Sequence, residues 1–334
     1  MKKLVALLLA LVMMLGVCSA MADNIKMDKL TLEFVPSKDA DVIITGTKNL
    51  PELLKAEMAN QGYDIGEVEI TVGTNYNATG EAMGAGSIDV GWLPAGTYIL
   101  YSDEVDVILT ATRAGLSNDS ENPADWTGDA NKTTGDSSNQ VGFYRALIYA
   151  TPSAYGKELA AKVNAGEKLT WEDLNKASWT VANNSSSAGY IYPTLWLMEN
   201  YDGKKLTDLE HVAPGIQYGD QFAQAAAETV DIIVCYADGR RAYEAAWQLP
   251  IGETEATGKA GMGRKDSIWN ELNVIGVTPG IYNDQFKTAM QNALINIINT
   301  EEGKAIFSVY SHEGYTVAVD SDYDGTRAAQ QAVK

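Results

Sequence analysis

Apolar and polar positions along this chain recur with periods that predict alternating strands and helices. Residues 30–35 alternate like a strand, and a helical pattern follows over residues 50–61. Two further strand patterns, over residues 68–72 and 87–94, enclose a helical pattern over residues 77–85. This order of elements is typical of a mostly parallel sheet that is covered by helices.

Side chains near the carboxyl ends of these strands are the first candidates for a binding site, because parallel sheets bind their ligands there. Ser37 follows the first strand pattern, Tyr76 follows the second, and residues 92–95 close the third. We therefore expect these positions to border a ligand site.

A polar stretch separates this first unit from a second one. Residues 117–140 are rich in Asn, Asp, Ser, Thr and Gly, which predicts a long surface loop. A strand pattern over residues 143–150 opens the second unit, and strand patterns over residues 179–182 and 230–235 belong to it. The second unit is therefore also α/β.

The end of the chain returns to the pattern of the first unit, with a strand pattern over residues 273–277 and helical patterns over residues 283–299 and 301–310. We therefore expect the chain to cross twice between two lobes, each a mixed, mostly parallel sheet flanked by helices. The predicted lobes are lobe I, from residues 23–114 and 274–334, and lobe II, from residues 115–273.

The first 22 residues have the features of a secretory signal. A basic pair precedes an apolar run over residues 4–17, which is too short to span a membrane, and small residues follow at Ala20 and Ala22. We expect cleavage after Ala22, which leaves 312 of the 334 residues, enough for two domains. The alternative is a lipid anchor at Cys18, although Val17 before it is bulkier than such sites prefer.

The charge of the chain limits its partners. The sequence contains 44 acidic and 25 basic side chains, a formal charge of −19, which argues against nucleic acid or an anionic membrane as partner. An anionic ligand would be repelled by this charge, so its site must attract it through local donors and arginines. Cys235 would be the only cysteine after cleavage, and it falls in a buried strand pattern, so we expect no disulfide within the chain.

Three consecutive serines, Ser185 to Ser187, stand between the strand pattern over residues 179–182 and a helical pattern over residues 190–201. The first turn of a helix leaves about four backbone N–H groups unpaired and carries about half a positive charge. Hydroxyl residues in such a turn suit a small oxyanion. The alternative is that Ser185 or Ser186 is only the N-cap of the helix.

Patterns for catalysis and metal binding are weak. The sequence has no Gly-x-Ser-x-Gly motif, and His211 and His312 lie far from any nucleophile signature and at no metal-ligand spacing. Residues 320–325 imitate the start of a calcium loop, but Gln331 stands where a bidentate Glu is required. We therefore expect no enzyme, no metal and no cofactor, and we expect Asp324 to cap the last helix.

Five short segments of the chain are informative as a combination, in the order in which they follow one another. They are residues 34–37, 89–98, 186–190, 230–233 and 278–284. In this combination the chain resembles the phosphate-, phosphite- and phosphonate-binding proteins of ABC importers, over nearly its whole length after the signal. The resemblance implies a two-lobed type II periplasmic-binding-protein fold.

The resemblance also implies an oxyanion site on the serine turn. In the family, a Ser-Thr-Ser-Gly turn holds the phosphonyl oxygens with hydroxyl and backbone N–H groups. Aligned on Gly189, the matching positions are Ser186, Ser187 and Ala188. Ala188 lacks one family hydroxyl but keeps its backbone N–H.

Further ligand contacts are implied in both lobes. A family tyrosine of the first lobe matches Tyr76, and a family histidine that contacts the anion matches Tyr218. An acidic family residue matches Asp238, which would accept a hydrogen bond from a P–OH or N–H group of the ligand. The alternative is that Asp238 serves only the turn that it forms with Gly239.

Two departures from the family bear on the ligand. Aminophosphonate binders have a second acid where this chain has Ile281, and a family tyrosine is matched by Phe143. Without that acid a ligand amine has no partner, so we favour phosphate, phosphite or a simple alkylphosphonate. Arg145 and Arg113 are candidates to compensate the ligand's charge.

We therefore expect an exported, monomeric solute-binding component of an ABC transporter that captures a phosphorus oxyanion between its lobes and delivers it to a membrane permease. Closure would be a hinge motion near residues 113–115 and 273–277. The alternatives are a binding protein for another solute, such as a sulfonate or a polyol, or an exported enzyme of the same fold that uses Asp238 on a phosphorylated or aminated substrate.

Overall fold

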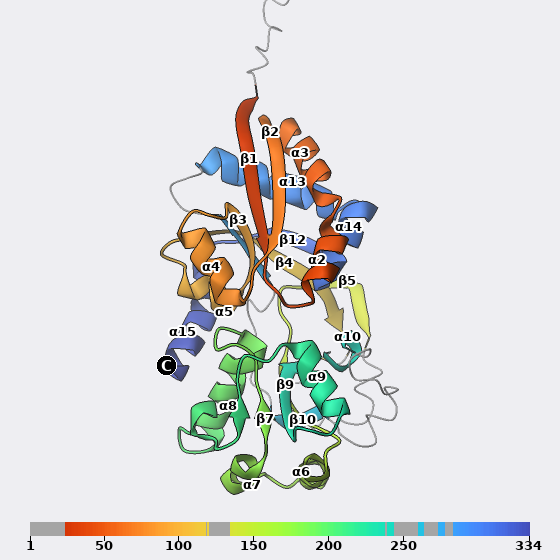
Figure 1. Ribbon diagram of the computed structural model, residues 1–334, viewed down its shortest axis with the longest axis vertical. Helices are drawn as coiled ribbons and strands as arrows, with labels where there is room; N and C mark the ends of the chain where they lie inside the picture. Colours follow the sequence, from red (N-terminus) through yellow and green to blue (C-terminus); the bar gives the residue numbers. More distant parts are fainter. Residues whose placement is uncertain are drawn as a thin grey trace, which may run out of the picture.

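The computed structural model describes residues 24–117, 119, 134–237, 239–243, 260–263, 273–277 and 283–334. These residues form two lobes, one above the other, each with a sheet flanked by helices (Figure 1). We call the upper lobe in Figure 1 lobe I and the lower one lobe II. The C-terminal helix α15 lies beside the waist between them.

The sheet of lobe I has the strand order β12-β4-β11-β3-β1-β2, and β5 pairs with β4. Its strands are β1 (Ile25–Phe34), β2 (Tyr63–Val72), β3 (Val90–Pro94), β4 (Asp106–Leu116), β5 (Gly135–Val141), β11 (Asn273–Val277) and β12 (Gly314–Val317). The expected α/β class with mixed sheets is confirmed, but parallel pairing is less common than expected. Only β1–β2 and β1–β3 are parallel among the described pairs of this sheet. The reason is that β11, by which the chain returns from lobe II, inserts between β3 and β4 and runs against both.

The sheet of lobe II has the order β10-β6-β9-β7-β8. Its strands are β6 (Ala146–Ala150), β7 (Trp179–Thr180), β8 (Val212–Ala213), β9 (Ile232–Tyr236) and β10 (Ala260–Gly263). The pairs β7–β8 and β7–β9 are parallel, whereas β6 runs against β9 and β10. The serine turn follows β7, so it leaves this sheet at the carboxyl end of a parallel strand.

Helices cover both faces of the lobe I sheet. They are α2 (Ala40–Thr47), α3 (Leu50–Asn60), α4 (Tyr76–Gly84), α5 (Ala95–Leu100), α13 (Asp284–Ile298), α14 (Glu301–Phe307) and α15 (Asp324–Val333), with the short turns η5 (Ser308–Tyr310) and η6 (Asp320–Tyr323). The main core lies under α2, α3, α13 and α14, where Phe34 stacks on Trp92 with ring centroids 4.2 Å apart. A second core, under α4 and α5, contains Tyr98 and Tyr323.

Lobe II is built in the same way. Its helices are α6 (Ala154–Asn164), α7 (Trp171–Lys176), α8 (Tyr192–Asn200), α9 (Tyr218–Ala226) and α10 (Gly239–Ala242), with η3 (Ser187–Ile191) and η4 (Leu206–Asp208). Side chains of α6, α7 and α8 pack on one face of the sheet, and those of α9 pack on the other. Thr170 caps α7, and Thr170 and Asp173 form a reciprocal capping box.

Two local expectations were wrong. Part of the expected loop over residues 117–140 is β5, which extends β4 at the edge of the sheet. Its side chains are exposed along almost its whole length, so no apolar alternation marked it as a strand. Asp324 is the first residue of α15 rather than its cap, a position that Tyr323 takes. Asp324 instead forms an ion pair with Arg327 one turn later.

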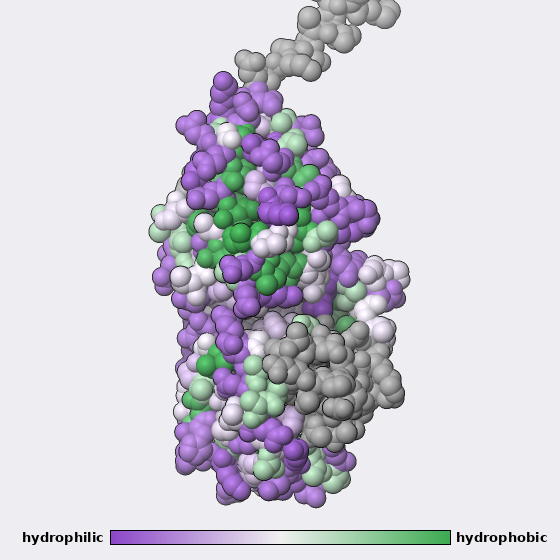
Figure 2. All heavy atoms as spheres, turned by 45° about the vertical axis from the view of Figure 1, so that its right-hand side comes forward, coloured by the Kyte–Doolittle hydropathy of each residue, from purple (hydrophilic) through white to green (hydrophobic). Residues whose placement is uncertain are grey.

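The surface of the molecule is uneven in polarity. In Figure 2, apolar residues gather in the middle of lobe I within a hydrophilic rim, and hydrophilic residues lie at the waist. Within the described ranges, no helix is long and apolar enough to cross a membrane. The polar waist is where the two lobes face each other.

Candidate functional site

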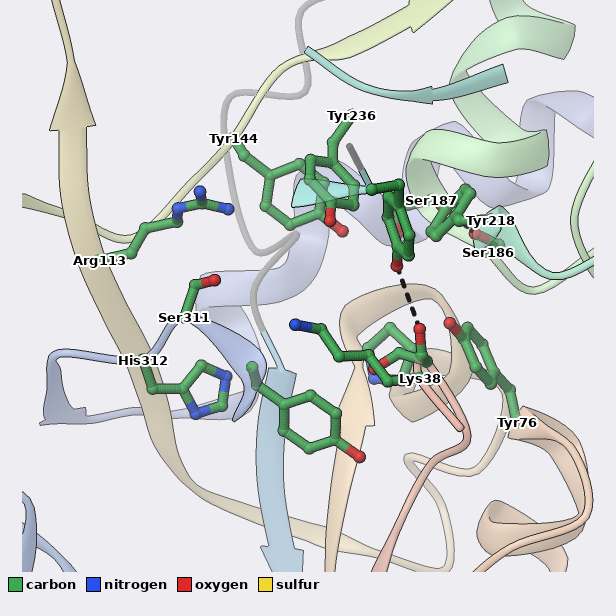
Figure 3. A pocket seen from close by; sticks show the side chains of 14 residues that line it. Lys38, Tyr76, Arg113, Tyr144, Ser186, Ser187, Tyr218, Tyr236, Ser311 and His312 are labelled. Carbon is green, nitrogen blue, oxygen red and sulfur yellow. Dashed lines mark hydrogen bonds between the residues drawn. The ribbon is translucent and has the colours of Figure 1, made fainter. Parts of the chain in front are cut away.

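A cavity lies between the two lobes and is lined by side chains of both (Figure 3). Its volume is about 70 Å³, which holds roughly five water molecules and so suits a small ligand. The lining is rich in hydroxyl groups, includes two cations, and contains no carboxylate among the residues that the structure describes. The lining residues are Ser37, Lys38, Tyr76, Pro94, Arg113, Tyr144, Ser186, Ser187, Tyr218, Tyr236, Tyr243, Tyr310, Ser311 and His312.

The serine turn forms the lobe II side of the cavity. Ser186 caps the helical segment that starts at Ser187, because its hydroxyl accepts a hydrogen bond from the backbone N–H of Gly189 at 3.2 Å. The same hydroxyl lies 2.9 Å from the Tyr218 hydroxyl. A side chain at Gly189 would collide with Ala182, since an added Cβ would lie 2.4 Å from the Cβ of that alanine. Ser186 is therefore both an N-cap and a lining residue.

The Ser187 hydroxyl is the least satisfied group of the turn. The residue is only 1% exposed, yet its Oγ has no hydrogen-bond partner in the described part of the chain. A buried hydroxyl without a partner is costly, and nearly all buried polar groups of folded proteins have one. Because Ser187 lines the cavity, a ligand oxygen there would satisfy it.

Two cations of lobe I point into the same space (Figure 3). Arg113 extends from β4 and lies over the ring of Tyr144, with 5.9 Å between its guanidinium carbon and the ring centroid. Lys38 follows β1, and no described side chain forms an ion pair or a hydrogen bond with its amine. Burial lowers the pKa of Lys38, because the charged form is partly removed from water.

His312 adds no charge to this wall. The ring is 2% exposed, and its Nδ1 lies 3.2 Å from the hydroxyl of Tyr315. Burial, helped by the positive charge of Arg113, lowers the pKa of His312 to about 3. The imidazole is therefore neutral at physiological pH.

Three tyrosines of the cavity, Tyr76, Tyr218 and Tyr310, remain protonated. Burial raises the pKa of Tyr76, Tyr218 and Tyr310 above the ordinary value of a phenol. The hydroxyl of Tyr310 donates to the backbone carbonyl of Val35. Tyr76 and Tyr218, on opposite lobes, can donate hydrogen bonds to a ligand at any physiological pH.

The two lobes touch directly at the cavity. The hydroxyl of Thr97, in α5, donates to the hydroxyl of Ser185 at 3.3 Å. The hydroxyl of Tyr243, after α10, donates to the backbone carbonyl of Ser37 at 3.1 Å. Gly96 lies so close to the serine turn that an added Cβ would be 2.4 Å from the Ser185 carbonyl. The structure is thus a closed form.

Five of the residues expected at the site meet in the cavity, namely Ser37, Tyr76, Ser186, Ser187 and Tyr218, and so does the candidate cation Arg113. Ala188 belongs instead to an apolar cluster with Ile191 and Tyr192. Gly189 does not line the cavity, and it packs closely against Ala182. Asp238 and Ile281 lie outside the described residues.

Phe143 and Arg145 do not line this cavity, contrary to expectation. They line a neighbouring cavity, where the Nε of Arg145 lies 2.6 Å from a carboxylate oxygen of Asp119. Tyr144, the residue between them, reaches the cavity between the lobes. Tyr144 and Arg113 line both cavities, so the two cavities are neighbours that share these side chains.

Several lining residues were missed by the sequence reasoning. Lys38 directly follows Ser37, which was predicted to border the site. Its place in the sequence could therefore have identified it as a lining residue. Ser311 and His312 follow η5, just beyond the predicted helical pattern over residues 301–310, and His312 was considered only for catalysis and metal binding. Ser311 has a φ of +60°, a left-handed conformation that is uncommon for serine and often occurs at functional sites. Tyr236, Tyr243 and Tyr310 were also missed.

No described group of His, Cys, Asp and Glu side chains is arranged to hold a metal ion. In the segment that imitates a calcium loop, Asp320 accepts a hydrogen bond from Tyr98 and forms an ion pair with Arg327. The carboxylate is thus engaged within the protein.

Comparisons with known proteins agree with this architecture. A family model described as "ABC transporter, phosphonate, periplasmic substrate-binding protein" matches residues 32–323. A comparison with curated protein sequences finds no match.

Solved structures show the same fold at low sequence identity. A binding protein component of an ABC phosphonate transporter from Pseudomonas aeruginosa has a TM-score of 0.63 and 12% identity, covering 92% of this chain and 87% of its own. The PhnD1 protein from Prochlorococcus marinus, in complex with methylphosphonate, has a TM-score of 0.62 and 11% identity, covering 91% and 97%. An ATP-bound protein from Xanthomonas citri has a TM-score of 0.63 and 12% identity, covering 92% and 98%.

Proposed function

This chain belongs to the family of periplasmic substrate-binding proteins of phosphonate ABC transporters, and on that premise we propose that it captures a phosphorus oxyanion in the cavity between its lobes. The ligand class is phosphate, phosphite or an alkylphosphonate. As in its family, the protein is exported and passes its small ligand to the permease of the transporter. The structure of PhnD1 with methylphosphonate, which shares the fold, makes that compound a suitable first probe.

The observation that carries this proposal is the buried Ser187 hydroxyl, which lines the cavity without a partner in the described part of the chain. Beside it stand the Ser186 hydroxyl and the protonated Tyr218. A phosphoryl or phosphonyl group offers several strong acceptor oxygens, so it suits a wall of donors. The cations Lys38 and Arg113 supply the opposite charge that the acidic protein surface does not.

Affinity and closure are coupled in this arrangement. The serines and Tyr218 belong to lobe II, whereas Lys38, Tyr76 and Arg113 belong to lobe I. A small anion can contact both sets only when the lobes are closed, so its binding stabilises the closed form. The ligand therefore binds the closed form more tightly than the open form. A cycle of capture and release requires this difference in affinity.

Calorimetric titration tests the proposal. The protein is first unfolded and refolded to remove carried-over ligand, and it is then titrated with phosphate, phosphite, methylphosphonate, aminoethylphosphonate and sulfate. We expect tight binding of at least one of the first three. In the double variant Ser186→Ala, Ser187→Ala, affinity should fall by about 100-fold or more, because two hydrogen bonds to a charged group are lost.

The matched control is Ser308→Ala, which removes an exposed hydroxyl outside the cavity and should leave affinity unchanged. Circular dichroism shows whether each variant is folded. If none of the three phosphorus oxyanions binds the wild-type protein, or if the double variant binds them as well as wild type does, the proposal is wrong.

A further inference from the structure

A row of three buried side chains leads from the core of lobe I to the cavity. The indole Nε1–H of Trp92, in β3, donates to the hydroxyl of Tyr315, in β12, at 3.2 Å. The same hydroxyl lies 3.2 Å from Nδ1 of His312, which lines the cavity. Because all three side chains are buried, each of these polar groups depends on its neighbour in the row for a hydrogen bond.

The position of each proton in this row follows from the donors and acceptors that it contains. An indole nitrogen can only donate, so the Tyr315 oxygen accepts from Trp92. Burial raises the pKa of Tyr315, so its hydroxyl keeps its own proton, and among the described groups the acceptor within reach is Nδ1 of His312. If Nδ1 carried a proton instead, the buried hydroxyl of Tyr315 would have no acceptor, which is costly. Tyr315 therefore donates to Nδ1.

The other ring nitrogen of His312 then carries the one proton of the neutral imidazole. Burial and the positive charge of Arg113 lower the pKa of His312 to about 3, so the ring has a single N–H at physiological pH. Since Nδ1 is an acceptor, that proton is on Nε2. No described group forms a hydrogen bond with Nε2. In Figure 3 one ring nitrogen of His312 points into the cavity, where the amine of Lys38 also points.

We propose that His312 is a ligand-binding residue, whose Nε2–H donates a hydrogen bond to an oxygen of the phosphorus oxyanion, and that Tyr315 and Trp92 are positioning residues that fix its tautomer. This inference rests on the proposed function and adds a contact to the same site. In this tautomer Nε2–H can only donate, whereas the hydroxyl of a serine or tyrosine can donate or accept. The ligand oxygen that faces His312 must therefore be unprotonated, and a P–OH group is accommodated only elsewhere in the cavity.

The tautomer can be measured before any ligand is added. Long-range ¹H–¹⁵N correlation spectra distinguish a protonated ring nitrogen from an unprotonated one by its ¹⁵N chemical shift. The sequence contains 2 histidines, so the variant His211→Asn leaves only the signals of His312. At neutral pH we expect a protonated Nε2 and an unprotonated Nδ1. A proton on Nδ1, or on both nitrogens, would overturn the inference and leave oxyanion binding in place.

A pair of amide variants separates the roles of the two ring nitrogens. Nδ1 of histidine and the terminal atoms of asparagine lie two bonds from Cβ, whereas Nε2 and the terminal atoms of glutamine lie three bonds from it. His312→Asn can therefore keep the contact with Tyr315 but loses the donor in the cavity, and His312→Gln keeps a donor there. In calorimetry, affinity for methylphosphonate should fall about tenfold or more in His312→Asn, and at most about threefold in His312→Gln.

The matched control is His211→Asn, the same substitution at an exposed histidine that does not line the cavity. Its affinity for methylphosphonate should equal that of wild type. Circular dichroism shows whether each variant is folded, and the tautomer measurement on histidine 312 stands even if His312→Asn does not fold.

The positioning role of Tyr315 is tested by Tyr315→Phe, which removes the donor to Nδ1. Part of the ring proton should then move from Nε2 to Nδ1 in the ¹⁵N spectrum, and affinity for methylphosphonate should fall about three- to tenfold. Added to His312→Gln, which has no tautomer to fix, the same change should cost little further affinity. A purely structural role of Tyr315 would leave the tautomer unchanged and give the same loss of affinity in both backgrounds, which would overturn the positioning role.

The outcomes distinguish this inference from the proposed function. If His312→Asn binds methylphosphonate as tightly as wild type does, His312 does not contact the ligand, and the inference is wrong while oxyanion binding stands. Equal losses in His312→Asn and His312→Gln would also contradict it, because the donor at Nε2 would then make no difference. If wild type binds no phosphorus oxyanion at all, the proposed function fails, and the inference fails with it.

Discussion

The two walls of the cavity differ in the kind of recognition they can provide. The lobe II wall presents uncharged hydroxyl groups from the serine turn and from α9, with Ser186, Ser187 and Tyr218 at its centre. The lobe I wall presents charge, with Lys38 and Arg113 close to a histidine that stays neutral. Hydroxyl donors recognise the positions of oxygens, whereas cations respond to the total charge of the ligand.

The two walls therefore contribute differently to binding, and a ligand receives both contributions only when the lobes are closed. A ligand held by lobe II alone would be oriented without being neutralised, and one held by lobe I alone would be attracted but less well oriented. Since the overall charge of the chain is −19, the proposed anionic ligand would need the local positive charge of lobe I to offset the general repulsion. Three further experiments test this comparison, beginning with the largest expected effect.

The neutrality of His312 can be tested through stability. Its pKa is about 3 in the folded protein and near 6.5 when unfolded, so between these values the unfolded chain binds the extra proton. Stability should therefore fall as pH falls below 6.5, by about 1.4 kcal/mol per pH unit from this group. Denaturant unfolding of wild type and His312→Gln, from pH 7.5 to pH 4.5, should show a steeper loss in wild type. Equal slopes would mean that His312 is not kept neutral and that lobe I carries a third charge.

The uncharged character of the lobe II wall is tested by Tyr218→Phe. This change removes one donor and the partner of Ser186, so affinity for methylphosphonate should fall about tenfold. Because no charge is altered, the ratio of the affinities for methylphosphonate and for methanesulfonate, which has the same tetrahedral form but only one negative charge, should stay as in wild type. Tyr155→Phe, whose hydroxyl bonds to the Asp173 carbonyl away from the cavity, is the control. A changed ratio in Tyr218→Phe would remove the distinction between the two walls.

The contact between the walls is tested by Thr97→Val. The change keeps the side-chain shape and removes the hydrogen bond from lobe I to Ser185, so the closed form should lose about 0.5–1 kcal/mol. We expect a two- to fivefold faster release of methylphosphonate in stopped-flow measurements. Thr47→Val, which loses a hydrogen bond within α2, should release the ligand at the wild-type rate. Unchanged release from Thr97→Val would show that this bond does not hold the lobes together.

Much of the architecture could be predicted because its causes are local. The strand and helix patterns come from periodic apolar positions, and the serine turn stands out because three hydroxyl residues open a helix after a strand. The same reasoning missed β5, because an edge strand that is exposed on both faces has no apolar period. The family resemblance placed Tyr76 and Tyr218, which the cavity does bring together with the serines.

The sequence by itself determined the α/β class, the turn at Ser186 and Ser187 that opens a helix after a strand, and the membership in a binding-protein family. Each of these depends on residues near one another in the chain or on their order. Only the tertiary structure decided which charged or titratable side chains line the cavity together with the serine turn. Lys38, Arg113 and His312 come from three separate elements of lobe I, and their joint effect depends on burial and on which way each side chain points. A side chain's solvent exposure and facing partners arise from packing, so no local pattern contains them.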